Sequence, residues 1–287
     1  MPDFTSLLHI ALGGLALIAV LAFGTWIASL VRHDASLVDR MWSLMIAGPT
    51  LVYAAQTAWS GPRAFAVLAL VIAWGVRLAA YITWRNWGHG EDRRYQQIRA
   101  RNQPNFAFKS LYLIFALQMV LAWIVSAPTL AALAGDHAFG VLDVAGIVVA
   151  LAGFLFEAIG DAQMAAFKGD PANKGQVMDR GLWRTTRHPN YFGEACFWWG
   201  IGLIALGAGG LGAIWTLLSP LMMTVLLLKV SGVAMLEKDI GERRPAYRDY
   251  IARTSAFIPG PPRRRRRSRQ ARCPTRSRSR RSSSDAA

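Results

Sequence analysis

Gly181-Leu-Trp-Arg-Thr-Thr-Arg-His-Pro-Asn-Tyr-Phe-Gly-Glu194 lies between two very hydrophobic stretches of the chain and gathers polar side chains at the mouth of a predicted membrane helix. Polar groups at that depth are costly unless they meet one another or a polar ligand. Two arginines and a histidine in so short a segment suit an anionic, phosphate-bearing ligand, because guanidinium forks two hydrogen bonds onto phosphate oxygens. A basic loop that only sets membrane topology would explain the charge, but it would not require the asparagine, tyrosine and glutamate.

Outward from this segment, the composition is that of a polytopic membrane protein. Hydrophobic residues make up 53% of the 287 residues, and 11 residues are tryptophan. Apolar runs long enough to cross a bilayer are predicted at Leu7–Leu30, Met41–Trp59, Phe65–Trp84, Ser110–Leu133, Phe139–Met164, Tyr191–Leu206 and Leu211–Met235. The first run lacks a cationic start and a small-residue cleavage site, so we expect it to remain as a helix. The predicted fold is all-α, with seven transmembrane helices.

Basic residues alternate between the connections. They gather in segments 31–40, 85–109 and 166–190 and after the last run, whereas the intervening connections carry only Arg63. The positive-inside rule then places the N-terminus outside and the C-terminus in the cytoplasm, which requires an odd number of crossings. The polar loops, and the chemistry with them, are expected to face the cytoplasm.

The chain is predicted to have a transmembrane domain over residues 1–260 and a disordered basic tail over 261–287. The tail carries a net +10 of the total charge of +15, so the rest of the chain carries +5. Its low complexity argues against a packed core. Such a tail would bind anionic lipid at the membrane surface, bind nucleic acid without sequence preference, or have no role. Cys196 and Cys273 form no recognisable metal pattern with the five histidines, so we predict no metal.

Four groups of polar residues are expected to meet on the cytoplasmic side. The first lies at the start of the second predicted helix, and the second lies within and just after the third. Asp39, at the start of the second helix, either caps that helix or positions a substrate. Arg77 lies inside the third helix, where a buried arginine needs an acidic partner or a ligand, and Asp39 is our first choice of partner. The segment Trp84–Tyr95 follows directly and is rich in charge.

The third group comes from the end of the fifth helix, and the fourth is the opening segment itself. Glu157 and Asp161 are four residues apart, so they share a helical face and repel unless a cation or a hydroxyl-rich group such as a ribose lies between them. Segment 245–259 is predicted to lie on the membrane surface beneath these loops. The chain has no glycine-rich dinucleotide motif and no Walker loop, so a dinucleotide would need a different arrangement.

At these residues the chain resembles the bacterial DUF1295 group of the steroid 5-alpha reductase-like superfamily. The resemblance runs from about Asp34 to Pro259. It rests on Val38-Asp-Arg-Met-Trp42, Trp74-Gly-Val-Arg77, Arg85-Asn-Trp-Gly-His-Gly-Glu-Asp-Arg-Arg-Tyr95, Gly181–Glu194, Leu236-Glu237 and Pro245-Ala-Tyr-Arg-Asp-Tyr250. The part Arg187–Glu194 also resembles sterol C14 reductases and the isoprenylcysteine and phospholipid methyltransferases.

The resemblance implies a membrane enzyme, in the bacterial inner (cytoplasmic) membrane, that binds NADPH near the cytoplasmic side. Hydride would pass to the β-carbon of an enone in a lipophilic, steroid- or isoprenoid-like substrate. The glutamine–glutamate pair and the tyrosine of the steroid enzymes are missing here, which leaves Asp39, Arg77 and Tyr81 as the catalytic candidates. The implied cofactor contacts are Asn86, Glu91, Asp92, Arg94, Tyr95, Asp161, Lys168, Arg184, Arg187, His188, Asn190, Tyr191 and Glu194, with Arg187 and His188 at the phosphates.

Two alternatives stay open. One is an S-adenosylmethionine-dependent lipid or isoprenyl methyltransferase on the same scaffold, against which the Arg85–Tyr95 segment and Asp161 argue. The other is a non-catalytic lipid-binding membrane protein, which the missing tyrosine favours and the polar residues on the nucleotide side disfavour. The expected partners in each case are a lipophilic small molecule and membrane lipids, with no specific nucleic acid.

Overall fold

The computed structural model describes residues 2–230, 232–237 and 240–262, and within these residues it contains helices and no strand. The helices are α1 (Phe4–Arg32), α2 (Leu37–Gln56), α3 (Gly61–Arg85), α4 (Arg93–Arg101), α5 (Phe106–Ser110), η1 (Leu111–Ala116), α6 (Leu117–Ala134), α7 (Val141–Gly169), η2 (Pro171–Asn173), η3 (Gly181–Arg184), α8 (Pro189–Gly209), η4 (Gly210–Leu217), α9 (Leu218–Val225), η5 (Leu226–Val230), α10 (Val233–Glu237), α11 (Ile240–Arg243) and α12 (Ala246–Arg253). The all-α fold class is confirmed. Residues 263–287 of the predicted basic tail lie outside the described residues.

The chain is an integral membrane protein by the length and composition of its helices. Among the described residues, five segments are long and apolar enough to cross a bilayer: Phe4–Arg32, Gly61–Arg85, Phe106–Ala134, Val141–Gly169 and Pro189–Glu242. Helix α2 is not among them, since Asp39, Arg40 and several uncharged polar residues lower its hydropathy. The sixth and seventh predicted runs fall together in the last segment, which the structure divides into α8 and a returning α9–α10. The number of crossings therefore stays a prediction.

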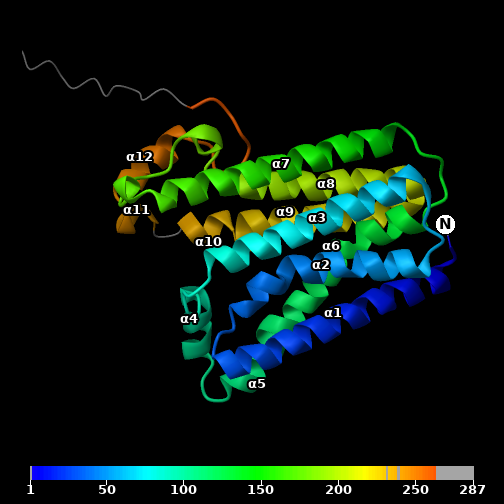
Figure 1. The fold of residues 1–287 in the computed structure, drawn as a ribbon, viewed down its shortest axis with the longest axis horizontal. Helices are drawn as coiled ribbons and strands as arrows, with labels where there is room; N and C mark the ends of the chain where they lie inside the picture. Colours follow the sequence, from blue (N-terminus) through cyan, green and yellow to red (C-terminus); the bar gives the residue numbers. More distant parts are fainter. Residues whose placement is uncertain (1, 231, 238–239, 263–287) are drawn as a thin grey trace, which may run out of the picture.

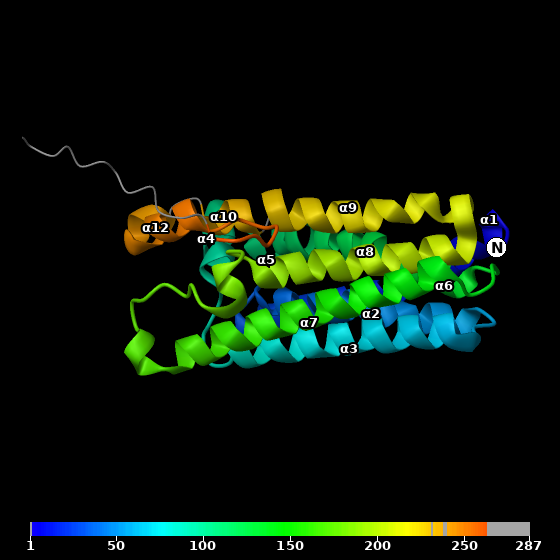
Figure 2. The same cartoon turned by 90° about the horizontal axis from the view of Figure 1, so that it is seen from above.

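The long helices lie side by side along one axis, and their connections alternate between the two ends of the bundle (Figures 1 and 2). One end, called the polar end below, is formed by residues 86–105, 170–188 and 240–262 and carries α4, α11 and α12. The start of α1 lies at the opposite end (Figure 1). The charged segments that the sequence analysis grouped together thus lie at the same end of the molecule.

Helices α7 and α8 pack with their backbones in direct contact. A Cβ atom on Gly153 would lie 2.5 Å from the backbone nitrogen of Phe197 and 2.6 Å from the carbonyl oxygen of Gly193. Glycines recur every seven residues, at Gly146, Gly153 and Gly160 of α7 and at Gly193, Gly200 and Gly207 of α8. Seven residues are close to two helical turns, so the glycines share a face and let the two helices approach. The approach brings Glu157 of α7 beside Glu194 of α8.

A buried ion pair fastens α3 to α7 at the end opposite the polar end. The Nε and Nη2 atoms of Arg63 donate to the Asp143 carboxylate at 2.6 and 2.9 Å, and the backbone N–H of Gly140 donates to the same carboxylate at 2.8 Å. The Nη1 atom of Arg63 donates to the carbonyl of His137 at 2.8 Å. Arg63, the basic residue in connections that otherwise lack arginine and lysine, is therefore held within the protein, where the Asp143 carboxylate balances its charge.

Candidate functional site

A cavity of about 800 Å³ opens at the polar end, between α3, α7, the start of α8 and the α11–α12 segment. Its wall contains nine of the proposed site residues: Tyr81, Asp92, Arg94, Asp161, Lys168, Arg187, His188, Asn190 and Tyr191. The other seven, Asp39, Arg77, Asn86, Glu91, Tyr95, Arg184 and Glu194, do not line it. The cavity size suits a drug-sized or larger polar ligand.

Four cationic side chains line the cavity and form no ion pair with any described residue. They are Arg85, Lys168, Lys174 and Arg244. Lys168 is close enough to Arg85 and to Arg244 for its charge to be repelled by both. Like charges without a carboxylate at ion-pair distance create a local positive potential, which attracts an anion.

Arg77 bridges two carboxylates of α7. Its Nη1 atom donates to Glu157 at 2.6 Å and its Nη2 atom donates to Asp161 at 2.5 Å. The expected pairing of Arg77 with Asp39 is wrong, because α3 turns this face toward α7 and not toward the start of α2. Of the two groups that the sequence left open between Glu157 and Asp161, a cation or a hydroxyl-rich ligand, the structure places a cation there, the guanidinium group of Arg77.

Three buried carboxylates share this one arginine. Glu157, Asp161 and Glu194 are each less than a tenth exposed. Glu157 also accepts a hydrogen bond from Trp74 Nε1 at 3.1 Å, whereas none of the described residues donates to Glu194. An excess of buried carboxylates over cations favours binding of hydroxyl or amide donors nearby. Asp161, which faces the cavity with Asn190 beside it, is the member of the group that a ligand would reach.

Tyr81 lies between two arginines at the cavity wall. Its hydroxyl donates to the backbone carbonyl of Asp161 at 3.3 Å, and the guanidinium carbons of Arg77 and Arg85 lie 5.5 and 5.7 Å from its ring centroid. Cations at these distances interact favourably with the ring face. Of the three catalytic candidates, Tyr81 alone lines the cavity.

Asp39 holds α4 against α2. Its two oxygens accept hydrogen bonds from Tyr95 Oη at 2.5 Å and Arg94 Nη2 at 2.9 Å. Gln118 Nε2 approaches the Tyr95 hydroxyl at 3.4 Å. Burial, together with the Asp39 charge, raises the pKa of Tyr95 above its usual value, so the phenol stays protonated as a donor. Asp39 therefore orders the chain beside the cavity, and Arg94 reaches the cavity wall from this cluster.

The Arg187–His188 pair of the opening segment is held by protein partners. Arg187 Nε and Nη2 donate to both oxygens of Glu237 at 2.6 and 2.7 Å, and its Nη1 donates to the carbonyls of Ile251 (3.1 Å) and Thr254. His188 Nε2 lies 3.0 Å from the same Glu237 carboxylate. Each guanidinium nitrogen of Arg187 thus has an acceptor in the chain, so its contact with cofactor phosphates stays a prediction without support from these contacts.

The C-terminal segment forms one wall of the cavity. Tyr250 of α12 is buried and donates to the carbonyl of Trp183, and the backbone N–H of Gly260 donates to Thr185 at 3.0 Å. Thr186 pairs with Ser255 as an isolated parallel bridge. Segment 245–259, predicted to lie beneath the polar loops, is thus bound directly to the opening segment.

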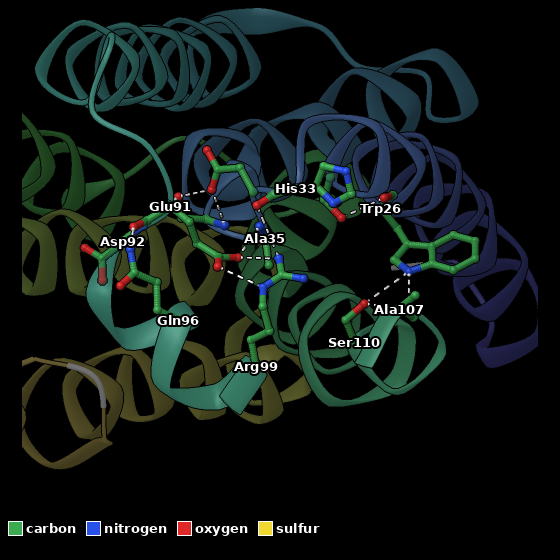
Figure 3. Close-up of polar contacts among 12 residues, drawn as sticks. Trp26, His33, Ala35, Glu91, Asp92, Gln96, Arg99, Ala107 and Ser110 are labelled. Carbon is green, nitrogen blue, oxygen red and sulfur yellow. Dashed lines mark hydrogen bonds and ion pairs between the residues drawn. The ribbon is translucent and has the colours of Figure 1, made fainter. Parts of the chain in front are cut away.

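Glu91 anchors α4 outside the cavity (Figure 3). It accepts a hydrogen bond from the backbone N–H of Ala35 at 2.8 Å and two from Arg99 at 2.7 and 2.9 Å. Burial alone would raise the pKa of Glu91, but the hydrogen bonds from Arg99 and Ala35 outweigh it and lower that pKa below its ordinary 4.5. Nearby, Trp26 Nε1 bonds to Ala107 and Ser110 and ties α1 to α5 (Figure 3).

Replacing Glu91 with glutamine should destabilise the protein at neutral pH and have little effect in acid. A carboxyl group whose pKa is lower in the folded state stabilises the fold above its unfolded pKa, and this contribution disappears as pH falls through the folded value. The gap in melting temperature between wild type and Glu91→Gln should therefore be constant above about pH 5 and close below it. Melting curves at several pH values measure this gap, with Asp170→Asn as an exposed control. A gap that persists unchanged in acid would contradict the assignment.

Two other proposed contacts lie away from the cavity. Asn86 ends α3, where its side chain accepts from Arg85 at 3.2 Å and its carbonyl accepts from Arg40 at 3.3 Å. Arg184 is exposed at the end of η3.

Sequence reasoning did not assign Lys174, Arg244 and Tyr247 to the site, although all three line the cavity. The available signals were the positive charge of segment 166–190 and the tyrosines of Pro245–Tyr250. Burial, with the nearby Glu237 charge, raises the pKa of Tyr247 to about 12, so its hydroxyl is a neutral donor at physiological pH.

Comparisons with known proteins agree with the resemblance. The family model described as "Protein of unknown function (DUF1295)" matches residues 25–254. An uncharacterized protein of Schizosaccharomyces pombe is 26% identical over 277 residues, which cover 86% of this chain and 78% of that protein. No solved structure matches the chain.

Proposed function

The chain belongs to the DUF1295 family, and on that premise we propose that it is a membrane-embedded, NADPH-dependent reductase of a C=C bond in a lipophilic substrate. The observation that carries the proposal is the cavity at the polar end, with unpaired cations in one part of its wall and carboxylate, amide and phenol groups in another. A phosphorylated dinucleotide presents the matching groups, which are phosphates, ribose hydroxyls and a carboxamide.

The cations fit the phosphates. Lys168 interacts with both Arg85 and Arg244, and none of the three forms an ion pair with a carboxylate of the described residues. A ligand phosphate would relieve their mutual repulsion and accept charge-assisted hydrogen bonds. An extra phosphate, as in NADPH compared with NADH, adds negative charge where the wall is most positive.

The carboxylate and amide groups fit the sugar and the base. Asp161 would accept hydrogen bonds from ribose hydroxyls, and Asn190 offers both a donor and an acceptor to a carboxamide. Arg77 keeps Asp161 in place through its 2.5 Å ion pair. Arg77 is thus proposed as a positioning residue, and so is Asp39, which holds Arg94 at the wall.

A bound nicotinamide would supply a hydride to an electron-poor carbon of the substrate. The residues of this chain would orient the reactants, exclude water from between the helices, and deliver the proton that completes the reduction. Tyr81 and Tyr191 are the proposed donors, because their phenols line the cavity beside Asp161 and Asn190. The hydroxyl of Tyr191 bonds to none of the described residues, so it is available to a substrate carbonyl.

We further propose seven crossings, with α2 and the α9–α10 return added to the apolar segments. The N-terminus would then lie outside and the polar end in the cytoplasm, as the distribution of arginine and lysine indicates. A location in a bacterial cytoplasmic membrane remains a prediction from the resemblance.

Binding of NADPH to the purified full-length chain tests the proposed function. We expect NADPH to bind, and Lys168→Gln to weaken binding by about tenfold or more, since a hydrogen bond to a charged group is worth about 1.5–3 kcal/mol. Lys109→Gln, which removes a lysine outside the cavity, should leave affinity unchanged. Titration of each variant with NADPH, followed by the fluorescence of the bound nicotinamide, measures both affinities. Binding of S-adenosylmethionine in its place would favour the methyltransferase, and binding of neither would favour a non-catalytic protein.

With a lipophilic enone as substrate, Tyr191→Phe should retain NADPH binding and lose turnover.

A further inference from the structure

A second cavity, of about 440 Å³, forms a groove between α2 and α3 on the outer surface of the bundle. It shares no residue with the first cavity. Its lining consists of Arg40, Met41 and Leu44 of α2, of Ala79, Ala80, Thr83 and Trp84 of α3, and of Trp87 just beyond α3. All but Arg40 and Thr83 are hydrophobic, so most of the groove suits a hydrocarbon chain.

One end of the groove carries a poorly satisfied cation. Arg40 is mostly buried, and its Nη2 makes only long contacts, at 3.3 Å to the Asn86 carbonyl and at 3.7 Å to Asp34. Its Nε has no hydrogen-bond partner. Asp34 is a weak partner because its Oδ2, the oxygen that faces Arg40, lies beyond hydrogen-bond distance, while its Oδ1 accepts from the hydroxyl and the backbone N–H of Ser36 at 2.5 and 2.9 Å. Arginine has five N–H donors, so this guanidinium retains capacity for an anion.

Two tryptophans mark the depth of this end. Trp84 and Trp87 are 64% and 73% exposed, although large aromatic side chains are normally buried in a protein. In membrane proteins, exposed tryptophans gather at the level of the lipid headgroups. Arg40, beside them, therefore lies where a lipid phosphate would lie, and Ala79, Ala80 and Leu44 continue toward the acyl region.

We propose that this groove binds an anionic membrane phospholipid, with its phosphate at Arg40 and an acyl chain along Met41, Leu44 and Ala80. The ligand must be amphipathic, because the groove combines one cation with an apolar floor. It should be anionic, because the carboxylate that faces Arg40 lies beyond hydrogen-bond distance, at 3.7 Å. Basic pockets between membrane helices hold anionic headgroups in the same way.

The test uses the full-length chain in nanodiscs made from equal amounts of phosphatidylcholine and phosphatidylglycerol, without cofactor or substrate. Native mass spectrometry measures the phosphatidylglycerol that each variant retains. We expect wild type to retain phosphatidylglycerol and Arg40→Gln to retain about fivefold less, the effect of one basic residue near the headgroup. Arg32→Gln, an exposed arginine at the same end of the bundle, should behave as wild type.

A second pair of variants tests the apolar floor without changing charge. Ala80→Phe would fill the groove and should also lower retention, whereas Val120→Phe, at an exposed apolar position of α6 outside the groove, should not. Equal loss in Arg32→Gln would show a general surface attraction and overturn the proposal. Full retention in Arg40→Gln, or retention of phosphatidylcholine alone by wild type, would overturn it as well. NADPH binding is measured separately, so the two proposals fail independently.

Discussion

Replacing Arg77 with glutamine is expected to lower the stability of the protein by about 3–5 kcal/mol, because breaking a buried ion pair leaves uncompensated charge in the interior. Arg77 is the only cation within ion-pair distance of Glu157 and Asp161 among the described residues. Without it, three carboxylates would lie together with no guanidinium group. Thermal unfolding in detergent measures the loss, and NADPH titration of the folded fraction should show weaker binding through the displaced Asp161.

A double variant distinguishes this explanation from general damage to α3. Removing both partners of a buried pair costs less than removing one, so Arg77→Gln with Glu157→Gln should recover part of the lost stability. The stability of Arg77→Lys should lie between those of wild type and Arg77→Gln, since an ammonium group cannot fork onto two carboxylates. Arg101→Gln serves as the exposed control. A double variant no more stable than the single one would contradict the proposed pairing.

Replacing Gly153 with alanine should destabilise the α7–α8 pair by about 1–3 kcal/mol, the usual cost of overpacking. The new Cβ would meet backbone atoms of Phe197 and Gly193 at 2.5 and 2.6 Å, and backbone atoms cannot rotate away. The helices must separate, which would also move Glu157 away from Glu194. Thermal unfolding measures the loss of stability, and NADPH affinity should fall with it.

Gly24→Ala is the matched control for this prediction. Gly24 also lies within a long apolar helix, but a Cβ there would meet no atom within 4 Å. Alanine has the higher helix propensity, so this variant should be neutral or slightly stabilising. Equal destabilisation by both substitutions would mean that close packing at Gly153 is not the cause.

The structure changes the role of the most informative sequence motif. Arg187 and His188 suggested a phosphate site, but both bind Glu237, which follows them by about fifty residues. The unpaired cations of the cavity come from other elements, the end of α3, the end of α7, the 170–188 segment and the residue after α11. Arg187 and His188 therefore hold the cavity wall together, whereas cations outside the motif give the wall its unpaired positive charge.

The membrane character, the helices and the gathering of charged loops on one side of the membrane could all be predicted from the sequence. These properties depend on local composition and periodicity, which a single chain displays directly. The pairing of the charged residues depends on helix packing and could not be predicted in this way. Arg77 binds Glu157 of α7 and not Asp39, and Asp39 binds Tyr95 of α4, because helix packing brings together residues 80 and 56 positions apart in the chain. A buried charged group pairs with the opposite charge that helix packing brings within about 3 Å, and local sequence patterns do not reveal which residue that is.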